Sequence, residues 1–439
     1  MASSGNAEVA QKCPSSRNDW LIKIKESHEV YTNERSQTQP NIRKVPSRFR
    51  EVKAYRKCFD PVMASIGPYH HGKPEFEYME RLKAPFTHQF VSGCVYDITI
   101  FYSRILEVVP QARKSYADVS AEEFDDEAFA RLMLLDGCFV LHFIDCIEHN
   151  KENELTTNSY NVAFLVRDMF LLENQLPYLV LKVLMDMKFP CDGGRAMINN
   201  FINHQFSPLG QLKQREPGPS SVADAEQPTL HLLDLLRTKM LECPIMPSSP
   251  KSQAFNWHSF RSVKELKSVG IEFKKSRSSC LKDIRFKSHK IYGELSLPPI
   301  AIDDSSKPKF LNLMVYELFL DASQVYSVTS YICFLDSLID TADDVKELRS
   351  KGILLNSLGS DDQVADLFNQ VADEMVPHPR AYYDIKEGIE SHYKNRKKVS
   401  MVEFLTTHFS SPWTAFAFFA ATLVIILTCI QTVYTVYSR

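Results

Sequence analysis

The sequence predicts a mainly α-helical protein. It indicates a multi-helix globular body, a small antiparallel β element near 271–302 and one C-terminal transmembrane helix. Apolar residues recur at helical spacing through much of the chain. Glycine is scarce, at 14 of 439 residues, which disfavours Gly-rich phosphate-binding loops and many tight hairpins. The chain also ends in a long apolar run with no Asp, Glu, Lys or Arg from 409 to 438.

The composition is that of a globular protein, and it excludes some partners. Hydrophobic residues make up 44% of the chain and charged residues 24%, so a large core can form. A net charge of −3 gives no overall attraction to nucleic acid or to anionic lipid. The ten cysteines form no CxxC pair, residues 1–30 contain no secretory leader, and no Asn-x-Ser/Thr acceptor occurs. We therefore expect reduced thiols and a cytosolic body.

The N-terminal part divides into an arm and the start of a domain. Residues 1–40 are polar and poor in aliphatic side chains, which is typical of a flexible arm. Residues 41–408 are expected to form one α-rich domain. Two Pro/Ser-rich loops interrupt it, at 207–229 and 243–255. Because loops held by a rigid body often bind partners, we expect the arm at 1–40 and the region 207–255 to be contact surfaces.

The first half of the domain is predicted to be helical. Periodicity covers 76–109, with an interruption near Gly93 and an end near Pro110. Ser120 and Glu123 resemble a capping box, and the helix they would start is apolar on most faces beyond Leu132. Further helical runs are expected over 162–172 and 177–187.

The second half mixes strands and helices. Alternating patterns predict strands at 271–275, 283–287 and 291–297. Helical periodicity resumes at Phe310 and continues to about Lys398. Capping signatures are expected to mark three helix starts, at Ser262 with Glu265, at Thr341, and at Ser360 with Gln363.

The terminal run predicts a membrane-spanning helix over 411–437. About twenty helical residues, at about 1.5 Å each, cross a hydrocarbon core of about 30 Å. Trp413 stands at one end and Tyr434 and Tyr437 at the other, where aromatic rings favour the interface. The sequence NRKK precedes the run and only Arg439 follows it, so the positive-inside rule also favours a cytosolic body. We expect a single-pass protein with a C-terminal anchor, in the plasma membrane or an endomembrane.

Eight strings along the chain point to one family. They are IRKVP, SIGPYHHG, DGCFVL, DMFLLENQLPYLVL, LHLLDLLR, LMVYELFL, LIDTADDVKELRSKGI and FSSPWT. Together, over about 42–437, the chain resembles the plant family called "domain of unknown function 247". The resemblance implies recognition or signalling at a plant membrane and no known catalysis. We therefore expect a protein without catalytic activity or cofactor and with an unknown protein partner. Some grass members are implicated as pollen-side determinants of self-incompatibility.

A polar trio interrupts one apolar region. Glu173, Asn174 and Gln175 lie among hydrophobic neighbours, and buried polar groups must find hydrogen-bond partners. They either bond helix ends across the core or contact a ligand, and we favour the first interpretation.

Two histidines offer an enzymatic alternative. His70 and His71 precede Glu75, a spacing similar to the HHxxxD pattern of acyltransferases, in which a histidine acts as general base. The motif is short and falls in a Pro-flanked loop, so a turn with locally bonded imidazoles explains it as well. No P-loop, GxGxxG, GxSxG or HExxH motif is present.

Two groups of potential metal ligands do not predict a metal site. One helix cannot present enough of Cys138, His142, Cys146 and His149 to one zinc ion. A second, acidic group lacks the glycine and spacing of an EF-hand, and helix capping accounts for part of it. That group comprises Asp336, Asp340, Asp343, Asp344 and Glu347.

The segment 261–290 is strongly basic, with ten Lys/Arg and three acids. We call its predicted exposed cations the basic face. They are Lys264, Lys267, Lys274, Lys275, Arg277, Lys282, Arg285, Lys287 and Lys290. Such charges usually decorate a solvated surface, but beside a membrane they could bind anionic lipid or an acidic partner. No nucleic-acid motif accompanies them, so nucleic acid is not expected.

Overall fold

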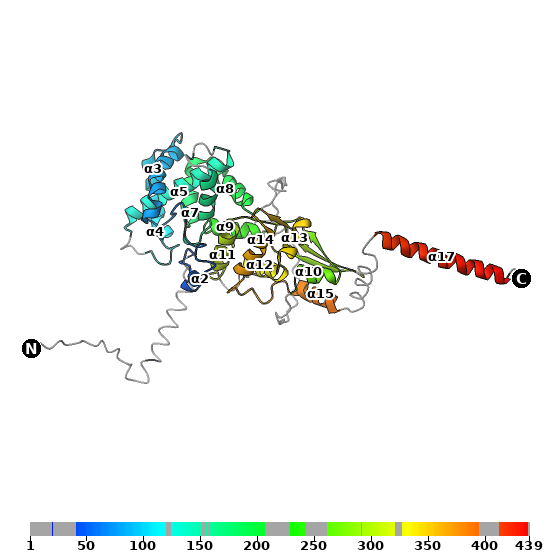
Figure 1. Cartoon of the computed structure of the whole chain (residues 1–439). Helices are drawn as coiled ribbons and strands as arrows, with labels where there is room; N and C mark the ends of the chain where they lie inside the picture. Colours follow the sequence, from blue (N-terminus) through cyan, green and yellow to red (C-terminus); the bar gives the residue numbers. More distant parts are fainter. Residues whose placement is uncertain are drawn as a thin grey trace, which may run out of the picture.

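The computed structural model describes most of the domain and the C-terminal helix. It covers residue 20 and residues 41–119, 124–151, 155, 159–206, 229–242, 261–290, 292–320, 327–394 and 412–437. The predicted arm, most of the two Pro/Ser-rich loops and the expected cap at Ser120 and Glu123 lie outside these residues. The described part is mainly α, with small sheets and one C-terminal apolar helix, as predicted (Figure 1).

The first half of the body is a helical cluster centred on α5 (Asp126–Glu148). Fifteen of its residues are buried, and α5 packs against α3, α4, α7 and α8 (Figure 1). Its N-cap is Asp125, whose carboxylate accepts the Ala128 N–H at 2.7 Å. The other elements here are α2 (Ser47–Glu51), η1 (Pro74–Phe76), α3 (Glu77–Val91), α4 (Ile98–Arg113), α6 (Ser159–Asp168), α7 (Tyr178–Lys188) and α8 (Gly193–His204).

Two helix ends differ from the sequence prediction. Helix α4 continues three residues beyond Pro110, because a proline near a helix end removes one backbone hydrogen bond without ending the last turn. Helix α6 ends at Asp168 rather than Leu172. The chain then runs through a buried, non-helical segment to Pro177, since Asp168 and the residues after it bond to a distant part of the chain.

The second half contains α9 (Leu232–Leu241), α10 (Val263–Ser268), α11 (Ser306–Glu317), α12 (Ser327–Leu338), α13 (Ala342–Ser350), α14 (Asp361–Val371) and α15 (Tyr383–Lys394). The predicted caps are confirmed. Ser262 accepts the Glu265 N–H, and capping boxes occur at Thr341 and Ser360.

The strands lie where the alternation predicts them, but the sheet is mixed rather than antiparallel throughout. Its order is β1 (Ile271–Lys275), β3 (Gly293–Leu297), β2 (Arg285–Ser288). The β2–β3 pair is antiparallel and the β1–β3 pair is parallel. The central strand, β3, is the most buried of the three. A second pair joins β4 (Ile300–Ile302) to β5 (Leu354–Asn356), a strand that the sequence did not predict.

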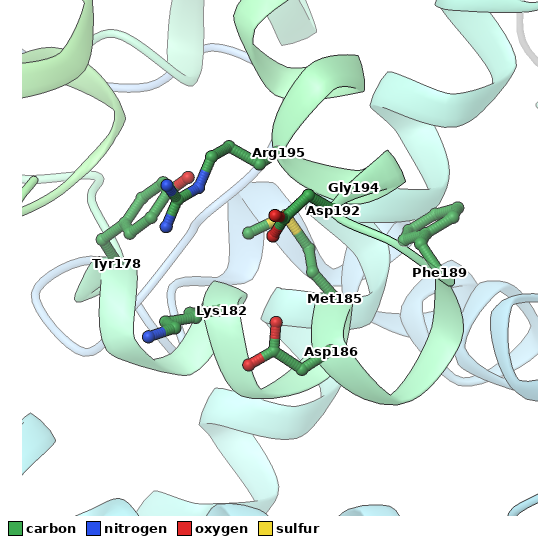
Figure 2. A pocket seen from close by; sticks show the side chains of 8 residues that line it. All are labelled: Tyr178, Lys182, Met185, Asp186, Phe189, Asp192, Gly194 and Arg195. Atoms are coloured by element: carbon green, nitrogen blue, oxygen red, sulfur yellow. The ribbon is translucent and has the colours of Figure 1, made fainter. Parts of the chain in front are cut away.

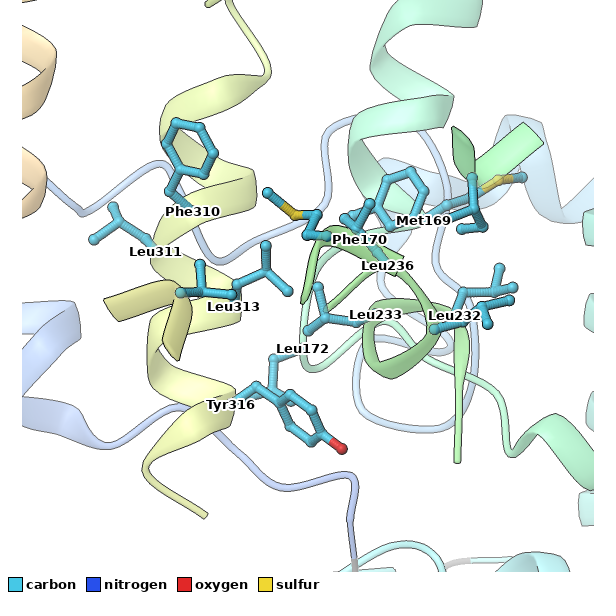
Figure 3. Close-up of a cluster of buried hydrophobic side chains, with 14 of the residues drawn as sticks. Met169, Phe170, Leu172, Leu232, Leu233, Leu236, Phe310, Leu311, Leu313 and Tyr316 are labelled. Carbon is cyan, nitrogen blue, oxygen red and sulfur yellow. The ribbon is translucent and has the colours of Figure 1, made fainter. Parts of the chain in front are cut away.

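The two halves share one hydrophobic core. Buried side chains from Ile42 to Ile389 form a single cluster. At the junction, leucines of α9 pack near Phe310, Leu313 and Tyr316 of α11, with Phe170 between them (Figure 3). The described body is therefore one continuous folding unit.

Helix α17 (Pro412–Tyr437) differs from all other helices in its exposure. Its stretch Phe416–Thr435 has a mean hydropathy of 2.2 and no buried share, and it is long and apolar enough to cross a membrane. Tyr434 and Tyr437 are exposed. Trp413 lies in the first turn of the helix, but its side chain is outside the described part of the chain.

Candidate functional site

A buried polar network holds the segment 42–72 against the helical body. We call its five side chains the clamp: Lys83, Asp136, Asp168, Glu173 and Asn174. All five are buried, and each contacts backbone groups of that segment. Four of the strings noted in the sequence meet here. IRKVP, SIGPYHHG and the residues just before SIGPYHHG supply the backbone groups, and DGCFVL and DMFLLENQLP supply most of the side chains.

Asp168 secures the beginning of the irregular stretch before Gly67. Its carboxylate accepts the backbone N–H groups of Val62, Met63 and Ala64 at 2.6–3.2 Å. It also accepts a hydrogen bond from the Arg167 guanidinium at 2.8 Å. One buried carboxylate thus satisfies three consecutive donors that no regular secondary structure would satisfy.

The predicted polar trio is buried and bonded within the protein. Asn174 Oδ1 accepts the Ile66 N–H at 2.7 Å, and Asn174 Nδ2 donates to the Ala64 carbonyl at 2.9 Å. Gln175 Nε2 donates to the Met169 carbonyl at 2.7 Å, while Gln175 Oε1 accepts the Leu233 N–H at 3.0 Å. These amides hold main chain from separate parts of the sequence together.

Glu173, the third member of the trio, is the charged centre of the clamp. It accepts the Val45 N–H at 2.6 Å, and its carboxylate lies 2.8 Å from Arg50 Nη2 and 3.3 Å from His70 Nε2. Burial opposes ionisation, but hydrogen bonds from His70 and Arg50 outweigh it and lower the pKa of Glu173.

A buried ion pair completes the clamp. Lys83 Nζ lies 2.6 Å from Asp136 Oδ1 and donates to the Ser65 carbonyl at 2.7 Å. Burial alone would lower the pKa of Lys83. The carboxylates of Asp136 and Glu80 have the larger effect and raise this pKa above its usual value, so the ammonium stays charged. Asp136 Oδ2 accepts the Gly67 N–H at 2.7 Å.

The chain at Gly67 fits only glycine. Its φ is +78°, in the left-handed region, and a Cβ there would lie 2.8 Å from the Gln175 carbonyl oxygen. Because the backbone at Gly67 passes so close to Gln175, the clamp side chains can form hydrogen bonds with backbone groups around Gly67.

The two histidines lie in different environments. Lys73 Nζ is 2.8 Å from His70 Nδ1, and because an ammonium only donates, that nitrogen accepts. His70 Nε2 then bears the proton and faces Glu173. His71 is exposed and lies 3.8 Å from the Glu80 carboxylate. The two imidazoles therefore face different carboxylates, Glu173 for His70 and Glu80 for His71.

A second buried network, which the sequence analysis missed, lies at the N-terminus of α12. The Glu317 carboxylate accepts the N–H groups of Ser327, Val328 and Thr329 at 2.9–3.1 Å, and Arg237 Nε donates to it at 2.8 Å. The signal in the sequence was a pair of opposite charges within the apolar strings LHLLDLLR and LMVYELFL.

Beside this network, His231 is buried against Tyr316 with ring centroids 4.8 Å apart. Its Nδ1 accepts the Asp234 N–H, and Tyr316 donates to the Asp234 carboxylate at 2.9 Å. Burial lowers the pKa of His231 to about 4. This histidine is therefore neutral at physiological pH and acts as a helix cap.

The potential metal ligands of the sequence have other contacts. Cys146 Sγ is 3.6 Å from His142 Nε2 within α5, and exposed His149 pairs with Asp145. Asp344 belongs to the capping box of α13. Among the residues that the structure describes, no group of three or more His, Cys, Asp and Glu side chains could hold a metal ion.

Two small cavities are present in the described body. One of about 20 Å³ lies between α7 and α8, where Lys182, Asp186 and Arg195 surround it (Figure 2). A second, of about 10 Å³, lies beneath Asn174 and Gln175. Each has room for about one water molecule.

All nine cations of the predicted basic face are exposed. Four of them form ion pairs, which offset part of the positive charge: Lys264 with Asp343 (3.6 Å), Lys267 with Glu347 (2.7 Å), Lys274 with Glu294 (2.5 Å) and Arg285 with Asp283 (2.7 Å).

The cysteines depart in part from the expected reduced state. Seven described cysteines form no disulfide, including the exposed Cys191. Cys280 is disulfide-bonded, which the sequence analysis did not predict.

Comparison with known proteins gives a family but no activity. The family model described as "Plant protein of unknown function" (DUF247) matches residues 42–427. The UPF0481 protein At3g47200 of Arabidopsis thaliana is 26% identical over 430 residues, covering 90% of this chain and 86% of the relative. The putative UPF0481 protein At3g02645 of the same plant is 21% identical over 526 residues, covering 95% of each chain. No solved structure matches.

Proposed function

Because this chain belongs to the plant family DUF247, whose description assigns no reaction, we propose a function from its structure. We propose that it is a membrane-anchored recognition or signalling protein without catalytic activity. Helix α17 would anchor it, and the surface of the body would bind a protein partner.

The observation that supports anchoring most strongly is the exposure of α17. Its twenty-residue apolar stretch packs against nothing in the described body. At about 1.5 Å per residue such a stretch matches a hydrocarbon core of about 30 Å. Its threonine hydroxyls at 422, 428 and 432 donate to the helix's own carbonyls, which removes free polar groups from the lipid.

The interior of the body supports recognition at the surface rather than turnover in a pocket. The buried polar side chains of the clamp bond to main chain of the same protein. The segments 1–40, 207–229 and 243–255, which the sequence predicts as contact surfaces, lie largely outside the described residues.

Substitution at His71 separates recognition from an acyltransferase-like reaction. His70 has both ring nitrogens engaged, so a catalytic base would have to be the exposed His71. We expect the H71N variant to keep the wild-type function and the same neighbours in proximity labelling from its own tissue. Loss of function with the fold, membrane retention and labelled neighbours unchanged would instead support catalysis.

We also propose that the body faces the cytosol, because the basic cluster NRKK precedes α17 and the positive-inside rule places such clusters on the cytosolic side. The disulfide at Cys280 argues for the opposite side, since disulfides persist in oxidising compartments. The exposed thiol of Cys191 distinguishes the two orientations. We expect a membrane-impermeant maleimide to label it only after permeabilisation, and labelling in intact cells would reverse the proposed orientation.

A further inference from the structure

A second basic segment lies at the beginning of the body, where the sequence analysis did not identify one. Residues 43–57 contain a single acid, Glu51, and seven cations: Arg43, Lys44, Arg48, Arg50, Lys53, Arg56 and Lys57. Two of the seven are partly covered. Arg50 pairs with Asp60 and Glu173, and Arg43 lies over the Phe319 ring at 5.2 Å.

The other five cations form what we call the N-terminal basic surface: Lys44, Arg48, Lys53, Arg56 and Lys57. All are exposed, and no carboxylate of the described residues lies within ion-pair distance of them. Lys44 lies over the Tyr69 ring at 5.4 Å and Arg48 over the Phe49 ring at 4.6 Å. Rings orient a cation without neutralising it, so the five charges remain available to a partner.

The surface is held on a fixed platform. Val45, Phe49 and Tyr55 are buried between the cations, and the Tyr55 hydroxyl donates to the Gln370 carbonyl at 2.8 Å. The Glu173 carboxylate accepts a hydrogen bond from the Val45 N–H and so fixes the backbone there. Because the backbone that carries these cations is held in place, it loses little conformational entropy when they bind a partner.

Charge balance distinguishes this surface from the basic face at 264–290. Four of the nine cations of the basic face have acidic partners within 4 Å. On the N-terminal basic surface, none of the five has such a partner among the residues that the structure describes. The charges of Asp373 and Glu374 act on Tyr55 nearby. Counting these two and Glu51 against the five cations still leaves a net positive charge.

The link to α17 brings any face of the body within reach of a bilayer. The stretch 395–411 lies between α15 and α17, and its 17 residues span at most about 60 Å when extended. A body of about 350 residues has a radius of gyration of about 20 Å. The length of the tether therefore does not decide which face meets the lipid, and the charge of each face does. The tether also keeps the body at a high effective concentration near the bilayer.

We propose that the N-terminal basic surface rests on the anionic headgroups of the bilayer that α17 anchors in. This inference rests on the proposed membrane anchoring and adds the orientation of the body at the membrane. Each cation near an anionic leaflet changes the local binding equilibrium about fivefold. The surface thus orients the body and leaves the opposite side open to a protein partner.

The test uses the full chain in lipid nanodiscs of phosphatidylcholine alone or with about 30% phosphatidylserine. A limiting amount of an amine-reactive acetylating reagent labels lysines, and mass spectrometry gives the rate at each one. We expect labelling of Lys44, Lys53 and Lys57 to be about fivefold slower or more on the anionic discs. High salt should restore the rate, because it shortens the screening length to a few ångströms. Lys264 and Lys267, which are ion-paired, should change less than about twofold and serve as internal controls.

A pair of variants tests the charges directly. Replacing Arg48 and Arg56 by Gln removes two cations without touching the clamp. Labelling of Lys44, Lys53 and Lys57 on the anionic discs should then return to the rate on phosphatidylcholine alone. The matched variant with Arg277 and Lys287 replaced by Gln should retain the slower labelling.

Three outcomes would overturn the inference: equal labelling rates on the two discs, protection of Lys275, Lys287 and Lys290 instead, or stronger protection by soluble polyglutamate than by anionic lipid. The last would identify an acidic protein segment as the partner. Failure of the anchoring itself appears separately, as a chain that does not copurify with either disc.

Discussion

Replacing Asp168 by Asn is the sharpest test of the clamp. The substitution keeps the size of the side chain but removes its charge and turns one acceptor oxygen into a donor. Three backbone N–H groups, of Val62, Met63 and Ala64, and the Arg167 guanidinium share the native carboxylate. An amide oxygen can accept about two of these four bonds. At least two buried donors therefore lose their acceptor in D168N.

The cost follows from those lost bonds. Each unsatisfied buried donor costs about 1–3 kcal/mol, and breaking a buried charged pair costs about 3–5 kcal/mol. Because these terms overlap, we expect a loss of about 4 kcal/mol in the free energy of unfolding. With an unfolding entropy of about 2.1 cal/mol/K per residue over about 350 residues, this lowers Tm by about 5 °C.

Thermal unfolding of the full chain in detergent, followed by intrinsic fluorescence, measures this shift. Asp126→Asn is the control, because Asp126 pairs with Arg113 at the surface, where such pairs contribute about 1 kcal/mol or less. Hydrogen exchange should also accelerate at the amides of 62–64 in D168N alone. A D168N protein whose Tm lies within about 1 °C of wild type would refute the reasoning.

Two further predictions concern the same region. Because the pKa of Glu173 is lowered in the folded protein, its contribution to stability is present above the unfolded pKa and is lost as pH falls through the folded one. The Tm difference between wild type and E173Q should therefore be largest near pH 7 and shrink below about pH 4, and a pH-independent difference would contradict it. Gly67→Ala should lower Tm by at least twice as much as Gly72→Ala. Both positions have φ near +78°, but only a Cβ at Gly67 would meet a carbonyl oxygen, at 2.8 Å. Equal shifts would show that backbone conformation alone matters.

Much of the fold was predictable because its signals are local. The caps at Ser262, Thr341 and Ser360 depend on residues three or four positions apart, and the structure confirms them. The apolar C-terminal helix follows from composition alone. Strand positions followed from alternation. Alternation does not report the order of the strands, in which β3 lies between β1 and β2 and pairs in parallel with β1.

The clamp was less predictable because its partners are distant in sequence. Asp168 bonds to backbone more than one hundred residues earlier, and Asp136 bonds to Gly67. Sequence patterns identified Glu173 and its neighbours as buried polar residues without showing what they hold. The cations at 44–57 were overlooked because their charge alternates with buried aromatic residues, and only the structure separates the two sides.

Membrane fractionation shows directly whether α17 anchors the chain in a bilayer. The full chain and a chain ending at residue 408 would be expressed in plant cells, and the membranes washed with alkaline carbonate. We expect the full chain to stay in the pellet. The shortened chain should move to the supernatant while keeping its Tm, because nothing in the described body packs on α17. A full chain released by carbonate, or a shortened folded chain that stays in the pellet, would contradict it.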